Sequence, residues 1–143
     1  MLYGLWYALF DEHQTLEQIG GAMANSFVDA AGRDLSGALE KLERYRLLGT
    51  DYAREVHAHS HWITLSMILI VLGLAYERVN YGASIKLGLA VVLSIGSFMF
   101  PLGVLLQNFP FAMLGKLLAQ AGSLAVILSF LLITVGLFRP RSA

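Results

Sequence analysis

Three long apolar runs dominate the second half of the chain. The first, from Trp62 to Tyr76, contains no formal charge, the second, at residues 85–106, contains only Lys86, and the third, at about 114–138, contains only Lys116. A helix needs about 20 mainly apolar residues to cross a bilayer. The pattern therefore predicts three membrane-spanning helices, over about residues 61–79, 85–106 and 114–138.

A shorter apolar run opens the chain at residues 1–10 and stops at Asp11. In a helix, ten residues rise about 15 Å, which is half of a hydrocarbon core roughly 30 Å thick. The segment is either a short interfacial or re-entrant helix, or the end of a first span whose beginning is missing from this start site. Because the run is apolar on every face, the pattern favours the second interpretation.

Residues 11–56 combine helical periodicity with most of the acidic residues of the chain. Apolar residues recur every three or four positions at Leu16, Ile19, Met23 and Phe27, and again at Leu35, Leu39 and Leu42. This pattern predicts amphipathic helices outside the membrane, lying on its surface or against a partner. Nine acidic residues outnumber five basic ones in this region, so attraction to anionic lipid is not the expected reason.

Short polar and small residues predict where these helices begin and end. Ala31-Gly32 indicates a break, after which Asp34 or Ser36 can cap a second helix. Gly49 is expected to end that helix, and Thr50-Asp51 to start the one that enters the first span.

Small residues and one proline mark the later spans. Helices in lipid pack through small residues that let the backbones approach, and such residues are found at Gly115, Ala119, Gly122 and Ser123 in the last span and at Ser84, Gly88 and Gly96 in the middle one. We expect these to be ordinary packing faces. Pro101 should kink or break the middle span, because it removes a backbone hydrogen bond.

The composition supports the membrane assignment and excludes several kinds of function. Hydrophobic residues make up 57% of the chain and charged residues 14%, whereas soluble domains carry roughly 25% charge. We therefore predict an all-α integral membrane helical bundle. The formal net charge is zero, which gives no case for nucleic-acid binding. Since there is no cysteine, disulfides, thiolate metal sites and covalently attached c-type haem are excluded.

Basic residues near the spans predict the orientation. Arg78 and Lys86 flank one short loop, Arg139 and Arg141 follow the last span, and the opposite short loop has only Lys116 at its edge. Cytoplasmic loops are enriched in lysine and arginine. We expect the C-terminus to lie in the cytoplasm of a bacterial-type inner membrane, and residues 11–56 with the histidines to face the other side.

Three of the four histidines lie within five residues, at the entrance to the first span. His57 and His61 are four residues apart and share one helix face, whereas His59 points elsewhere. Imidazole binds zinc, copper and haem iron, so we predict a haem or metal site here, with His13 as a further metal ligand. The carboxylates on the same side of the first span could complete it: Asp11, Glu12, Asp51 and Glu55.

The alternative is that these histidines only bridge water and lipid at the membrane surface. The residues between His57 and His61 are Ala-His-Ser, so the zinc-protease motif HEXXH is absent. The spans also contain no arrangement of nucleophile and base and no pair of carboxylates. We therefore do not expect the chain to be an enzyme on its own.

The segment VHAHSHWITLSMILIVLGL resembles the H-x-H entrance to a spanning helix in the core subunits of haem-copper oxidases and nitric oxide reductases. It is still more similar to small four-span membrane proteins that carry the same signature. The resemblance covers about 25 residues and implies that His57 or His59 is an axial ligand of a low-spin haem b on the outer side, with the other hydrogen-bonded at the interface. His61 has no clear counterpart.

This chain departs from that family because its later spans contain no histidine for the opposite side of the haem. A second axial ligand would have to be His13, a methionine or a residue of a second protomer, unless the iron is five-coordinate. The first functional hypothesis is accordingly the binding of haem b, or of a copper or zinc ion, for electron transfer or metal handling. The alternative is a non-catalytic accessory subunit of a larger respiratory or oxidase complex. Under either hypothesis we expect a homo-oligomer or a larger membrane complex.

Overall fold

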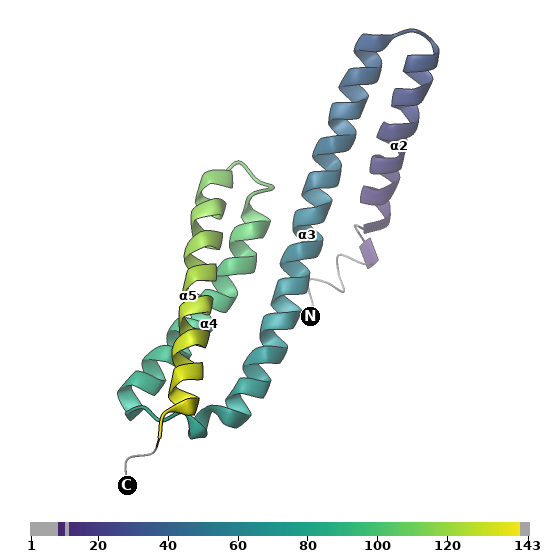
Figure 1. Cartoon of the computed structure of the whole chain (residues 1–143). Helices are drawn as coiled ribbons and strands as arrows, with labels where there is room; N and C mark the ends of the chain where they lie inside the picture. Colours follow the sequence, from purple (N-terminus) through teal and green to yellow (C-terminus); the bar gives the residue numbers. More distant parts are fainter. Residues whose placement is uncertain (1–8, 11, 141–143) are drawn as a thin grey trace. The chain divides into compact units, whose positions relative to one another are not determined.

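The computed structural model describes residues 9, 10 and 12–140 and is built from helices (Figure 1). The elements are α2 (Glu12–Ala31), α3 (Leu35–Ala75), the short 3-10 helix η1 (Tyr76–Arg78), α4 (Ala83–Leu106) and α5 (Ala112–Phe138). The helices α3 with η1, α4 and α5 are each long and apolar enough to cross a membrane. The prediction of an all-α membrane fold is confirmed. The half-span expected at residues 1–10 lies outside the described residues, apart from Leu9 and Phe10.

The chain divides into two compact units, Met1–Val56 and His57–Ala143, and α3 runs through both. In the first unit, α2 and the beginning of α3 form an antiparallel hairpin (Figure 1). The predicted break after Ala31 is confirmed, although Arg33 rather than Gly32 takes the left-handed conformation, with φ of 62°. Asp34 is the predicted cap: its carboxylate accepts hydrogen bonds from the Gly37 N–H at 3.0 Å and the Ser36 hydroxyl at 2.8 Å.

Small and polar residues line the contact between the two helices of this hairpin. Ala22 and Ser26 are buried on α2, and Lys41 of α3 forms an ion pair with Asp29. Near the open end, the Tyr52 hydroxyl lies 3.3 Å from a carboxylate oxygen of Glu12. Many of the larger apolar side chains of this hairpin are exposed: Leu16, Met23, Phe27, Val28, Leu35, Leu39, Leu42 and Leu47.

The predicted end of a helix at Gly49 is wrong, because α3 continues through it without interruption. Gly49 does not adopt the positive φ of a helix-ending glycine. The Thr50 hydroxyl, expected to begin a new helix, donates to the Arg46 carbonyl oxygen at 2.8 Å and so stays within the same one. At 1.5 Å per residue, the 41 residues of α3 extend about 60 Å, twice the thickness of the hydrocarbon core.

The core of the second unit lies between the end of α3, α4, α5 and the turn that joins α3 to α4. Its buried side chains are Leu65, Val79, Leu89, Leu93, Val126 and Ile133. Helix α4 is not broken at Pro101, which is buried within it. Helices long and apolar enough to cross a membrane thus cover all three predicted runs. Helices α4 and α5 begin two residues before the predicted bounds, and the first run forms the end of α3 and η1.

Glycines bring α4 and α5 into backbone contact. A Cβ at Gly103 would lie 2.3 Å from the Ala119 nitrogen, and one at Gly122 would lie 2.6 Å from the Phe100 nitrogen. The packing roles predicted for Gly96, Gly115 and Ala119 are thus confirmed, since all three are buried in this contact. The role predicted for Gly88 is wrong, because nothing lies within 4 Å of its Cβ position.

Candidate functional site

The unbroken helix α3 determines how the histidines are presented. Since residues four apart lie on one face of a helix, His57 and His61 share a face, and His59 lies on another, as the spacing predicts. His57 is exposed, whereas His59 and His61 are half-buried. The two imidazoles of one face are therefore separated by a single helical turn.

Helix α4 supports this face through aromatic contacts. The His61 ring lies 4.6 Å from the Phe100 ring, measured between centroids, and is tilted by 44°. One residue further along α3, Trp62 lies 6.4 Å from Phe98. Phe100 also packs against the apolar core of this unit. The His61 ring is thus supported on one side by Phe100, whose own position is fixed by the core.

Phe100 is a neighbour of His61 that the sequence does not identify. It lies within an apolar run of the middle span and nothing in its local pattern distinguishes it from Phe98. Its position depends on the register between α3 and α4, which the tertiary packing sets.

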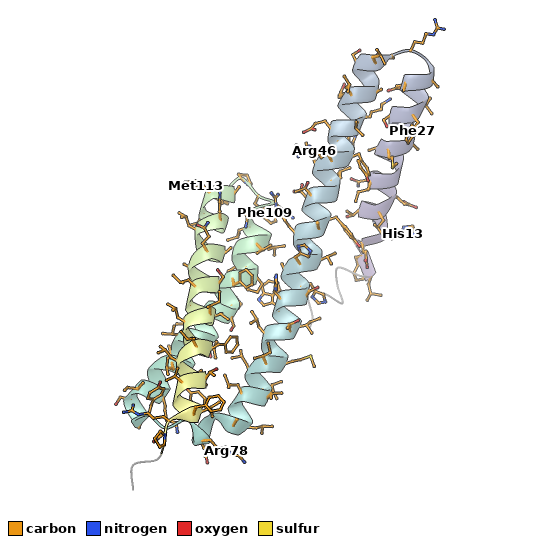
Figure 2. All side chains as sticks on the ribbon, in the orientation of Figure 1. His13, Phe27, Arg46, Arg78, Phe109 and Met113 are labelled. Carbon is orange, nitrogen blue, oxygen red and sulfur yellow. The ribbon has the colours of Figure 1, made fainter. Side chains whose placement is uncertain are left out.

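The fourth histidine belongs to the first unit. His13 lies in the first turn of α2 (Figure 2), its side chain is 84% exposed, and its Nδ1 lies 3.7 Å from a carboxylate oxygen of Glu17. The Glu12 carboxylate accepts a hydrogen bond from the Tyr52 hydroxyl, and the Asp51 carboxylate accepts one from the Arg54 guanidinium at 3.1 Å. Glu55 lies on α3 two residues before His57, and Asp11 lies outside the described residues.

His57 and His61 provide two of the four protein ligands that a structural zinc site takes. Among the residues that the structure describes, no three histidine, aspartate or glutamate side chains come together as a metal ion requires. For haem iron, which is held by one or two axial ligands, a single imidazole from this face is chemically sufficient.

Comparisons with protein-family models, with curated proteins and with solved structures gave no match for this chain. The resemblance of residues 54–78 to the oxidase and reductase subunits thus stays a prediction. The fold and the composition define the class: an all-α integral membrane protein with three helices able to span the bilayer.

Proposed function

We propose that this membrane protein holds a haem b or a metal ion through the histidines of α3, in electron transfer or metal handling. The supporting observation is the placement of His57 and His61 one turn apart on a face of an unbroken helix, with His61 packed against Phe100. A bound haem would supply one-electron transfer. The residues that would hold it are His57 or His61, and His59 is the alternative axial donor implied by the resemblance.

Among the described residues, one copy offers two imidazoles on this helix face, and this number favours a site shared by two copies. In a dimer with two-fold symmetry the same surface is used by both subunits, so two copies would bring four imidazoles together. Four nitrogen ligands suit zinc or copper, and one from each copy suits the two axial positions of haem iron. His13 is a further candidate donor.

We also propose that the histidines face the non-cytoplasmic side. The support is the distribution of basic residues, with Arg78, Lys86 and Arg139 at one end of the spans and Lys116 at the other. In this orientation the site would be open to redox partners or metal ions outside the cytoplasm.

The test is the absorption spectrum and metal content of the full chain purified from membranes in mild detergent. We expect either a stoichiometric copper or zinc content that His57→Ala and His61→Ala both reduce, or a haem spectrum that at least one of these variants removes. His59→Ala distinguishes a metal ion held by His57 and His61 from a haem held by His59. The variant leaves the metal content unchanged in the first case and removes the haem spectrum in the second. A colourless, metal-free preparation with normal helical content would overturn the proposal.

A specific observation favours a second function, that of an accessory subunit. The hairpin of α2 and α3 exposes large apolar side chains, such as Phe27 (Figure 2) and Leu39, although its own contact is lined by small and polar ones. Exposed apolar patches of this kind mark interaction surfaces. The proposed occupant is a helical partner subunit of a larger membrane complex.

Purification from native membranes in mild detergent tests this second function. We expect the chain to run with partner subunits and Leu39→Ser to weaken that association. Glu40→Ser, an adjacent exposed change that removes no apolar contact, is the matched control. If the unmodified chain runs alone as a small oligomer, the accessory role is wrong.

A further inference from the structure

A hollow beside the last turn of α5 combines apolar, aromatic and cationic groups. It is a shallow depression open to the surface, with a volume of about 550 Å³, and is lined by Tyr81, Thr134, Val135, Phe138 and Arg139. It lies within the second unit, involves none of the α3 histidines and does not depend on the proposed function.

The wall formed by Tyr81 is fixed by hydrogen bonds to the end of α5. The Asn80 amide side chain donates to the Pro140 carbonyl oxygen at 2.6 Å. The Asn80 backbone N–H donates to the Gly136 carbonyl oxygen at 2.9 Å. The Tyr81 hydroxyl donates to the Leu132 carbonyl oxygen at 3.0 Å. Gly136 permits this approach, because a Cβ there would lie 2.5 Å from a Tyr81 ring carbon. The hollow is therefore a built feature of the turn and helix together.

Arg139 supplies positive charge at the edge of the hollow. Its guanidinium carbon lies 5.9 Å from the centroid of the Tyr81 ring, a cation–π arrangement. Among the residues described, no carboxylate forms an ion pair with Arg139. Arg78, Lys86 and Arg139 outnumber the single acid, Glu77, at this end of the second unit. The charge here favours an anionic ligand.

The position of Arg139 along the span indicates which anion. The 27 residues of α5 extend about 40 Å, against a hydrocarbon core of roughly 30 Å. Arg139 follows its last residue and so reaches the depth of the lipid headgroups. Val135 and Phe138, both exposed, offer an apolar surface immediately beside it.

We propose that this hollow binds one anionic phospholipid. Arg139 would hold the phosphate, since a guanidinium pairs with phosphate oxygens in a bidentate manner, and one acyl chain would lie along Val135 and Phe138. Tyr81 holds the guanidinium over the hollow and is a positioning residue. Basic pockets at the membrane surface select anionic headgroups in this way.

Native mass spectrometry of the full chain in detergent, titrated with phosphatidylglycerol or phosphatidylcholine of the same acyl chains, tests the proposal. We expect phosphatidylglycerol to be retained in preference, and Arg139→Gln to lower its retention roughly fivefold. Phe138→Ser is expected to lower the retention of both lipids. Lys116→Gln, at the opposite end of α5, is the matched control and should leave retention unchanged.

Three results would overturn the proposal. Equal retention of the two lipids by the unmodified chain would remove the anionic selectivity, and this comparison needs no variant. Equal losses in Arg139→Gln and Lys116→Gln would show only general attraction to charge. Complete displacement of phosphatidylglycerol by inorganic phosphate would identify an anion site without a lipid.

Discussion

At the scale of single residues, Asp34 shows how a local pattern becomes a local structure. Its carboxylate accepts the Gly37 N–H and the Ser36 hydroxyl at the start of α3. These hydrogen bonds, the one from the Gly37 backbone first, lower the pKa of Asp34 below its ordinary value. A carboxyl group whose pKa is lowered on folding stabilises the folded state above its unfolded pKa, and this contribution is lost as the pH falls through the folded value.

We therefore predict that acid weakens the α2–α3 hairpin more in the natural chain than in Asp34→Asn. Asparagine also caps helices but does not titrate. Thermal unfolding of both proteins, followed by far-ultraviolet circular dichroism between about pH 6 and pH 3, measures the difference, because the unfolded pKa is about 3.9. The other carboxyl groups titrate in both proteins. Equal losses of thermal stability would contradict the role of Asp34.

Two glycines of α3 should respond oppositely to alanine. At Gly49, with nothing within 4 Å of the Cβ position, alanine should stabilise the helix by up to about 1 kcal/mol. At Gly37 the new Cβ would lie 2.5 Å from a carboxylate oxygen of Asp34 and 2.9 Å from one of Asp29. Gly37→Ala should therefore weaken the cap, by about 1 kcal/mol.

Hydrogen exchange of the backbone amides of α3 in the full chain measures both effects as local opening free energies. Gly49→Ala is the control for the general preference of helices for alanine. Greater protection of the first turns of α3 in Gly37→Ala would show that the cap tolerates the methyl group.

At the scale of elements, the apolar runs predict the helices that are long and apolar enough to cross a membrane, and the break after Ala31 follows from its residues. The continuity of α3 through Gly49 does not, since the same glycine can end a helix or lie within one. What decides is the backbone conformation of Gly49, which has no positive φ, and the Thr50 hydroxyl donates to the Arg46 carbonyl oxygen within the same helix instead of capping a new one. Similarly, Gly88 and Gly103 look alike in the sequence of α4, but only Gly103 faces α5.

The contact between α4 and α5 gives a prediction at this scale. Gly103→Ala places a methyl group against the backbone of Gly115 and Ala119 and should destabilise the second unit by about 1–3 kcal/mol. Gly88→Ala adds the same group to an open position of the same helix and, like Gly49→Ala, should leave stability unchanged or raise it by up to about 1 kcal/mol. Size-exclusion analysis of heated detergent samples compares their thermal stabilities. Similar behaviour of the two variants would disprove the close contact at Gly103.

At the scale of the whole molecule, composition and apolar runs predict the membrane class, because they depend on the sum of many residues. The candidate site is predicted only in part. Helical spacing places His57 with His61, but the support from Phe100 depends on the packing of α4 against α3. The spacing within one helix cannot predict the other ligands of the metal ion or haem. We propose that a second copy supplies them.

The proposed orientation can be tested with fusions to the C-terminus. The excess of basic residues beside the α3–α4 turn and after α5 predicts that a fused fluorescent protein is fluorescent and a fused alkaline phosphatase inactive. Fusions in the loop between α4 and α5 should give the opposite pair of results. An active phosphatase at the C-terminus would place the histidines on the cytoplasmic side.

The most direct test of a shared histidine site is native mass spectrometry of the full chain released from detergent, which counts chains and bound groups together. We predict an assembly of two chains that carries the mass of one haem or one metal ion, and loss of that mass in the double variant His57→Ala, His61→Ala. Single chains without added mass would contradict the account. So would an added mass that the double variant retains.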